Sequence, residues 1–322
     1  MFPRRFRAVL VAGAAFVAAA APLPAAAGAA TTAPAPDCGQ PAGPPADALT
    51  ALPAPRVIGL SGSVPIVTMQ PFAEFLIAMG YPEASLRDPR DGSLALSSYT
   101  DSAELAGAVA WYYERDAMRP MLVGHSQGGM LVVRTLHELA GAFREAIPVF
   151  DPAAGRALPR TSIRDPYTQA ERPVVGVRVS FAAALATGAL PRLLLGQWTM
   201  LPRLRKIPDT TLEFTGFTVP WDPIAGNLAT AEPYVATGTA AVRNVLLPAT
   251  YTHIGLPATE HLAAHPATRA WIDAYVPGSP PPLPDAADAD VRNLVHAADL
   301  WHSIRVHWCR EGLRRLALRG PA

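Results

Sequence analysis

A serine between glycines is the first feature of this sequence that could do chemistry. Residues 124–128 read Gly-His-Ser-Gln-Gly, which places Ser126 in a Gly-x-Ser-x-Gly pattern. A serine hydroxyl is a weak nucleophile at neutral pH, so it needs a base, a group that orients the base, and donors for the developing oxyanion. The glycines permit the close chain approach of a sharp strand-to-helix turn. Ser126 is therefore the predicted nucleophile.

The general base for this serine is predicted at His253. His253 comes directly after a predicted strand over residues 242–247. His261 and His265 lie on a predicted helix, where a solvated face explains them. His125 is adjacent to the serine, and side chains of adjacent residues at such a turn point apart. His253 is thus the histidine whose position suits proton transfer.

The carboxylate that would orient the imidazole is predicted at Asp222. This residue follows a predicted strand over 212–219 and precedes His253. A carboxylate there would accept the imidazole N–H and stabilise the imidazolium. An aspartate before proline is also a common turn residue. Asp151 is the main alternative, because it follows the apolar run after the nucleophile helix, and Asp209 is a third candidate.

Strand and helix patterns alternate around these residues. Strand patterns cover residues 56–60, 121–123, 146–150, 212–219 and 242–247, and helix patterns cover residues 71–79, 101–118, 130–139 and 260–276. This alternation predicts an α/β fold, with a mostly parallel central sheet and helices on both faces. Parallel strands end at a common edge, which would gather the loops that carry the candidate residues.

Residues 152–210 break the alternation and predict an insertion, a lid over the carboxyl edge of the sheet. The stretch 180–201 is apolar, but Gly188 and Pro191 interrupt it, which argues against a membrane span. The apolar side chains of such a lid would meet an acyl group or make transient contact with a lipid interface. The alternative is that they pack the core of the insertion itself.

In these residues and their order the sequence resembles the α/β-hydrolase superfamily, in the lipase and esterase style. The resemblance covers about residues 56–276 and is most specific at the Gly-His-Ser-Gln-Gly turn. It implies the chain order serine, acid, histidine. It also implies an oxyanion hole made by the backbone N–H groups of Gln127 and Leu60, with Ser61 as the alternative to Leu60. At residues 58–60 the chain reads Ile-Gly-Leu, where such hydrolases often carry His-Gly and an apolar residue.

This resemblance implies a serine hydrolase that cleaves carboxylic esters with an apolar acyl group, through an acyl-enzyme on Ser126. The expected substrate is a small-molecule or lipid ester. An acyltransferase or a peptidase would use the same residues, and a catalytically silent binding protein would keep the same fold. No metal or organic cofactor is expected, since the sequence has no four-cysteine set and no dinucleotide-binding loop.

Residues 1–30 are predicted to be a signal peptide. Arginines at positions 4, 5 and 7 precede an apolar stretch that is short for a spanning helix, and three alanines at 25–27 offer a cleavage site. The protein is therefore expected to be secreted or in the cell envelope. An uncleaved membrane anchor is the alternative. The formal net charge of +1 predicts no nucleic-acid partner, and the sequence makes no prediction of the oligomeric state.

The two cysteines agree with export. In an exported chain, Cys38 and Cys309 are most simply one disulfide, and two free thiols are the alternative. The bond would join an extended N-terminal arm, residues 31–55, to a linker and helical segment, residues 277–322. In the chain-entropy model so long a loop contributes about 4–5 kcal/mol to stability.

Overall fold

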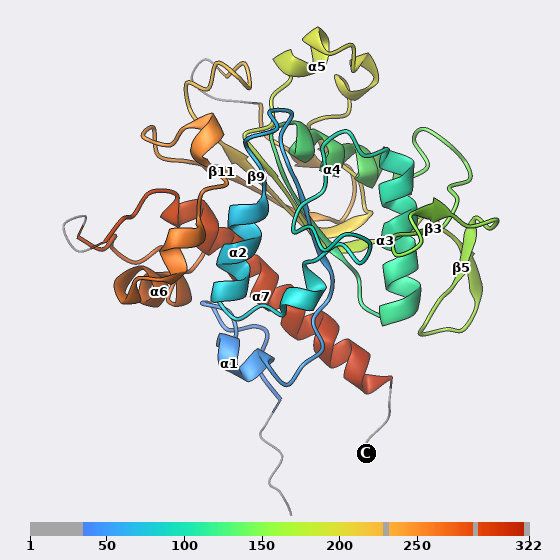
Figure 1. Cartoon of the computed structure of the whole chain (residues 1–322), viewed down its shortest axis with the longest axis horizontal. Helices are drawn as coiled ribbons and strands as arrows, with labels where there is room; N and C mark the ends of the chain where they lie inside the picture. The colour runs from blue at the N-terminus through green and yellow to red at the C-terminus, as the bar shows by residue number, and fades with distance from the viewer. Residues whose placement is uncertain (1–34, 228–231, 286–288, 319–322) are drawn as a thin grey trace, which may run out of the picture. The chain divides into compact units, whose positions relative to one another are not determined.

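A parallel sheet of five strands forms the centre of the protein (Figure 1). In hydrogen-bonded order the strands are β1 (Val57–Leu60), β2 (Met121–His125), β7 (Val179–Leu185), β9 (Thr211–Thr218) and β11 (Ala241–Leu246). The structure is a computed structural model that describes residues 35–227, 232–285 and 289–318. Each neighbouring pair of strands is parallel. The predicted α/β fold with a parallel central sheet is confirmed.

Helices cover both faces of this sheet. One face carries α2 (Gln70–Ala78), α6 (Pro266–Asp273) and α7 (Leu294–Ala317), and the other carries α3 (Ser102–Asp116) and α4 (Gln127–Leu139). Side chains of β2 alternate between the two cores: Met121 and Val123 pack on the α2 and α7 side, and Leu122 packs on the α3 and α4 side. A strand buried on both faces has a continuous apolar sequence, which is why β1 and β2 are short apolar runs.

Local side-chain chemistry sets several helix boundaries. Asp101 caps α3, because its carboxylate accepts the N–H groups of Ala103 (2.7 Å) and Glu104 (3.3 Å). The helix predicted over 260–276 is divided at Pro266 into a 3-10 turn and α6. Proline lacks the N–H that a continuing helix needs, but it is well suited to the first turn of a new one.

The remaining elements are short and connect or flank the main ones. They are α1 (Ala46–Leu49), η1 (Glu83–Ser85), β3 (Phe150–Asp151), β4 (Arg156–Ala157), β5 (Ser162–Arg164), β6 (Glu171–Pro173), α5 (Leu190–Leu194), η2 (Trp198–Met200), β8 (Lys206–Ile207), β10 (Val235–Ala236), η3 (His253–Gly255) and η4 (Glu260–Ala263). β3 pairs with β4 and β5 with β6 as small antiparallel hairpins, and β8 pairs with β10 in parallel.

The structure divides the range predicted as a lid insertion, residues 152–210. Within it lies β7, the middle strand of the sheet, so its apolar sequence reflects burial on both faces rather than a lid. Residues 150–173 form the two small hairpins, the first of which begins just before the predicted range. Only the segment from 187 to 205, with α5 and η2, passes the carboxyl edge (Figure 1). The strand predicted over 146–150 also lies outside the sheet, because Val149 pairs with Arg160 and Leu158 instead.

The C-terminal helix α7 belongs to the core, although the sequence places residues 277–322 outside the hydrolase domain. It has 24 residues and buries Trp301 and Trp308 completely. The predicted disulfide is present: Cys38 and Cys309 are bonded, with 5.6 Å between their Cα atoms. Residues 35–318 thus belong to one compact unit, and the bond fastens the N-terminal arm to α7.

The predicted signal peptide, residues 1–30, lies outside the described residues. Among the residues that are described, none of the helices combines the length and the apolar character needed to cross a membrane. Of the predicted arm, residues 35–55 are described, and they contain the short helix α1.

Candidate active site

Three predicted residues meet at the carboxyl edge of the sheet. Ser126 follows β2, Asp222 follows β9 and His253 follows β11. The Ser126 hydroxyl donates to Nε2 of His253 (2.9 Å), and Nδ1 of His253 donates to Oδ2 of Asp222 (2.7 Å). Asp222 and His253 are buried, whereas Ser126 is half-buried. The arrangement suits transfer of the serine proton to the imidazole.

The backbone at Ser126 has the strain that its turn requires. Its φ is 54° and its ψ is −115°, a conformation that residues other than glycine rarely adopt. A Cβ atom on Gly124 would lie 2.3 Å from the carbonyl oxygen of Gly128, and one on Gly128 would lie 2.1 Å from the carbonyl oxygen of Leu60. Both positions therefore exclude a side chain, which explains the glycines of the sequence pattern.

Asp222 is held by the loop that it begins. Its Oδ1 accepts the N–H groups of Ile224 and Ala225, both at 3.0 Å. Burial alone would raise the pKa of Asp222, but the hydrogen bonds from His253 and from these backbone groups lower it overall. The alternative acid Asp151 is not at this site, since its carboxylate caps a turn by accepting the N–H groups of residues 153 and 154.

His125 has a role that sequence reasoning missed. Its Nε2 donates to the backbone carbonyl of His253 (2.8 Å), so it holds the loop that carries the candidate base. Burial, and next the nearby His253, lower the pKa of His125 to about 3. The ring is therefore neutral at pH 7, with its proton on Nε2. No sequence signal beyond its place before the serine indicates this contact.

The two predicted oxyanion donors differ in their surroundings. Gln127 is the first residue of α4, where the backbone N–H groups have no partner within the helix and the helix dipole favours an anion. Leu60 lies within the sheet, where it pairs with Gly124, and the N–H of Ser61 donates to the carbonyl oxygen of Leu96 (2.9 Å). Neither Leu60 nor Ser61 therefore offers an N–H that suits the prediction.

Gly62 is the residue of the β1 loop that lies beside the nucleophile. A Cβ atom on Gly62 would lie 3.5 Å from Cβ of Ser126. Within the described part of the chain its N–H has no hydrogen-bond partner. Gly62, two positions after Leu60, is thus the candidate on this loop for a second donor, and the oxyanion hole itself stays a prediction.

Arg192 of α5 is a second residue that the sequence did not single out. Its guanidinium donates to the side-chain oxygen of Gln127, and to that of Gln197 at 2.6 Å. Arg192 is 2% exposed, and burial lowers its pKa to about 10. The contact attaches the α5 segment to the residue that follows the nucleophile.

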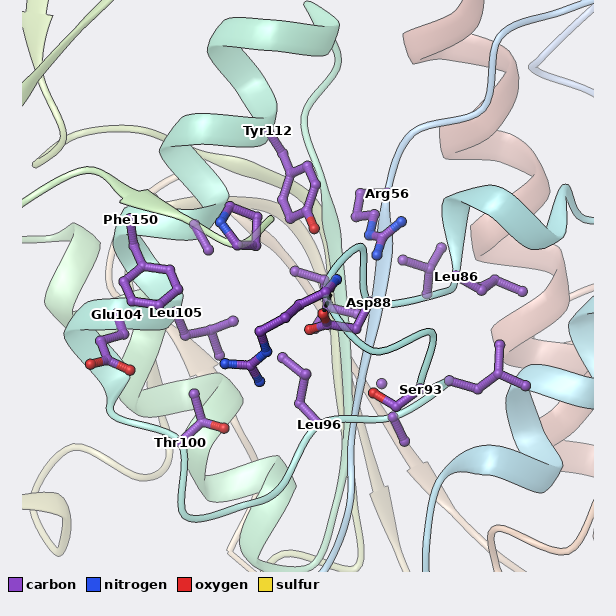
Figure 2. Close-up of a pocket in the computed structure, with 18 of the residues that line it drawn as sticks. Arg56, Leu86, Asp88, Ser93, Leu96, Thr100, Glu104, Leu105, Tyr112 and Phe150 are labelled. Carbon is purple, nitrogen blue, oxygen red and sulfur yellow. Dashed lines mark hydrogen bonds between the residues drawn. The ribbon is translucent and has the colours of Figure 1, made fainter. Parts of the chain in front are cut away.

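A cavity of about 370 Å³ lies away from this site, at the open edge of β1 (Figure 2). β1, α3 and residues 86–96 line it, and none of the three candidate residues does. Figure 2 shows the hydroxyl of Tyr112 directed toward Arg56, with Phe150 on the opposite side. Nor does the described part of the chain group three or more His, Cys, Asp or Glu side chains so that they could hold a metal ion.

A second group of serine, histidine and carboxylate lies between the sheet and α7. Glu213 of β9 accepts hydrogen bonds from Ser303 (2.7 Å) and from Nε2 of His307 (3.2 Å). Arg243 of β11 donates to Glu213 (3.2 Å) and to both oxygens of Asp299 (2.8 Å each). The group joins two strands to one face of α7.

Comparison with known proteins adds nothing to what the fold and the site show by themselves. No protein-family model matches the chain, and no curated protein matches it. Among solved structures, one described as "RedJ with PEG molecule bound in the active site" is similar at 15% identity and a TM-score of 0.30, over 76% of this chain and 98% of that one. At this TM-score the similarity carries no argument about the fold or the activity of this chain.

Proposed function

We propose that the protein is a serine hydrolase of the α/β-hydrolase type, which cleaves carboxylic esters through an acyl-enzyme on Ser126. The observation that carries the proposal is the continuous path of hydrogen bonds from Ser126 through His253 to Asp222. Further support comes from the strained turn at Ser126 and from the N–H groups of Gln127 and Gly62, for which the described part of the chain offers no backbone partner.

The proposed reaction follows from these contacts. Oγ of Ser126 attacks the ester carbonyl carbon while Nε2 of His253 takes its proton. The negative oxygen of the tetrahedral intermediate accepts the N–H groups of Gln127 and Gly62, and Asp222 stabilises the imidazolium. His253 then gives the proton to the departing alcohol oxygen. A water molecule repeats the sequence on the acyl-enzyme and releases the acid.

The proposed substrate is an ester with an apolar acyl group. The support is the apolar segment of α5 and η2, which is attached to the nucleophile turn through Arg192 and Gln127. We also propose that the protein acts outside the cytoplasm, because its Cys38–Cys309 disulfide is compatible with an oxidising compartment.

The test is covalent labelling with a fluorophosphonate probe, together with turnover of p-nitrophenyl esters of different chain lengths. The wild type should be labelled once, and Ser126→Ala should lose both labelling and turnover. Ser303→Ala is the matched control, since Ser303 is buried in the second group and should leave both unchanged. A wild-type protein that folds but is neither labelled nor active would overturn the proposal.

A further inference from the structure

Residues 251–258, which we call the base loop, carry His253 and are bound by the last segment of the chain. The side-chain amide of Asn293 donates to the carbonyl oxygens of Gly255 (2.7 Å) and Ala258 (2.8 Å). An amide nitrogen has two hydrogens, so one bond to each carbonyl uses both. Asn293 directly precedes α7. The segment that the sequence places outside the hydrolase domain therefore reaches the loop of the candidate base.

His296, in the first turn of α7, makes a contact of the same kind. Its Nε2 donates to the carbonyl oxygen of Leu256 (2.8 Å), and its side chain is completely buried. A carbonyl oxygen can only accept, so Nε2 carries the proton of the ring. Burial lowers the pKa of His296 to about 4, which leaves the ring neutral at pH 7. His296 thus holds the base loop without a positive charge that would oppose the imidazolium of His253.

The backbone at Asn293 suits this contact. Its φ is 63°, in the left-handed region that asparagine tolerates better than most residues. The side chain is buried, with an exposed fraction of 8%. Two residues later, the N–H of Val295 donates to the hydroxyl of Tyr251 at the start of the base loop (3.0 Å). Asn293, Val295 and His296 together therefore make four hydrogen bonds to the base loop.

Packing gives the base loop little support on one side. Thr252, Ile254 and Ala258 are exposed. A cavity of about 560 Å³ lies beside the loop, and its lining includes both the loop and residues 290–293. This cavity interrupts the close packing that fixes the side chains of a protein core. The hydrogen bonds to the carbonyl oxygens of the base loop therefore determine its position on this side.

We propose that Asn293 and His296 are positioning residues that hold the imidazole of His253 in place for proton transfer. The inference rests on the proposed function and adds two residues to it. The contact to be maintained is the one of 2.9 Å between Nε2 of His253 and the hydroxyl of Ser126. A displacement of about 1 Å at a reacting group can cost about 100-fold in rate. Small shifts of the base loop should therefore be visible in kcat.

The first test compares kcat and KM for a p-nitrophenyl ester. His296→Phe keeps a flat ring without a donor, and kcat should fall about tenfold with little change in KM. His296→Gln keeps an N–H at the place of Nε2 and should recover most of kcat. Asn293→Gly permits the positive φ, removes both donors and should lower kcat about 100-fold. The matched control is His307→Phe, since His307 is also a buried histidine of α7 but contacts Glu213; it should lose stability and keep kcat.

The second test measures the geometry of the base without turnover. The proton between Nδ1 of His253 and the carboxylate of Asp222 should give a low-field signal in proton NMR. This signal should broaden in His296→Phe and Asn293→Gly and persist in His307→Phe. Folded His296→Phe and Asn293→Gly with the kcat and the signal of the wild type would overturn the inference, as would an equal loss of kcat in His307→Phe. A wild type that shows the signal but hydrolyses nothing would overturn the proposed function, and the signals of the variants would then decide the positioning role.

Discussion

Two groups of serine, histidine and carboxylate differ in the order of their hydrogen bonds. At the carboxyl edge the imidazole of His253 lies in the middle, between the hydroxyl of Ser126 and the carboxylate of Asp222. Beneath α7 the carboxylate of Glu213 lies in the middle and accepts from both Ser303 and His307. Only the first order lets the imidazole take the serine proton.

The two groups also differ in charge and access. Arg243 donates to Glu213, Ser303 and Asp299, so the second group has its own cation, and α7 covers it. Ser303 and His307 are each 1% exposed, while Ser126 is half-buried on a strained turn. The same residue types therefore join helix to sheet in one place and form a candidate reactive centre in the other.

The largest expected difference between the groups is in the effect of removing the histidine. His253→Ala should lower kcat for a p-nitrophenyl ester by about 10⁶-fold, the scale of losing the base of a serine hydrolase. His307→Gln should leave it unchanged, because His307 contacts Glu213 beneath α7, whereas the candidate site is at the carboxyl edge of the sheet. Steady-state kinetics would test both variants, with circular dichroism to show that they fold. Equal losses of turnover in the two variants would contradict the different roles given to the two groups.

The orienting carboxylate should matter next. Asp222→Asn keeps the shape of the side chain but favours the wrong imidazole tautomer, and it should lower kcat by about 10⁴-fold. Asp151→Asn is the control, since Asp151 only caps a turn remote from His253. A larger loss of kcat in the Asp151 variant than in the Asp222 variant would indicate that Asp151, and not Asp222, orients the imidazole.

Glu213 should govern stability in acid rather than activity. Burial raises its pKa, but the hydrogen bonds from His307 and Ser303 and the charge of Arg243 lower it overall to about 2. A depressed carboxyl pKa stabilises the fold above the unfolded value, near 4.3, and this contribution disappears as the pH falls toward 2. By linkage, the lowered pKa of Glu213 contributes up to about 3 kcal/mol to the free energy of unfolding.

Urea unfolding of the wild type at a series of pH values would measure that contribution. The free energy of unfolding should fall as the pH is lowered from 6 to 2. Glu213→Gln should be less stable at pH 6 and should lose less stability across the same window, because it lacks the titrating group. Parallel pH dependence in the two proteins would show that Glu213 does not have the lowered pKa.

The smallest expected effect belongs to Ser303. Ser303→Ala removes one donor to Glu213 while Arg243 and His307 remain, so the unfolding free energy should fall by about 1 kcal/mol. Chemical denaturation of this variant and the wild type would measure it. A fall in ester turnover with no change in stability would contradict the structural role given to this second group.

The candidate site was predictable where its signal is local. The turn at Ser126 is encoded by two glycines that nothing else could replace, and the places of Asp222 and His253 after strands are visible in the apolar pattern. Their catalytic roles stay predictions, although the structure brings them together. The pairing of Cys38 with Cys309 follows from there being no other cysteine.

What the sequence did not predict depends on long-range contacts. Except for Ser180, β7 is apolar because both its faces are buried. Its pattern therefore has no period that separates it from the apolar segment of α5. The candidate for the second oxyanion donor changes from Leu60 to Gly62 because the pairing of β1 with β2 decides which N–H groups of the described residues remain without a partner. The hydrogen bond of His125 reaches a residue 128 positions away in the sequence, and that of Arg192 reaches one 65 positions away.

Because α7 comes after all five strands of the sheet in the chain, it has a consequence for synthesis. Until residue 317 has been made, the face of the sheet that α7 covers has no partner, and the nascent protein exposes an apolar surface that invites aggregation. A chain that stops before Leu294 should be insoluble.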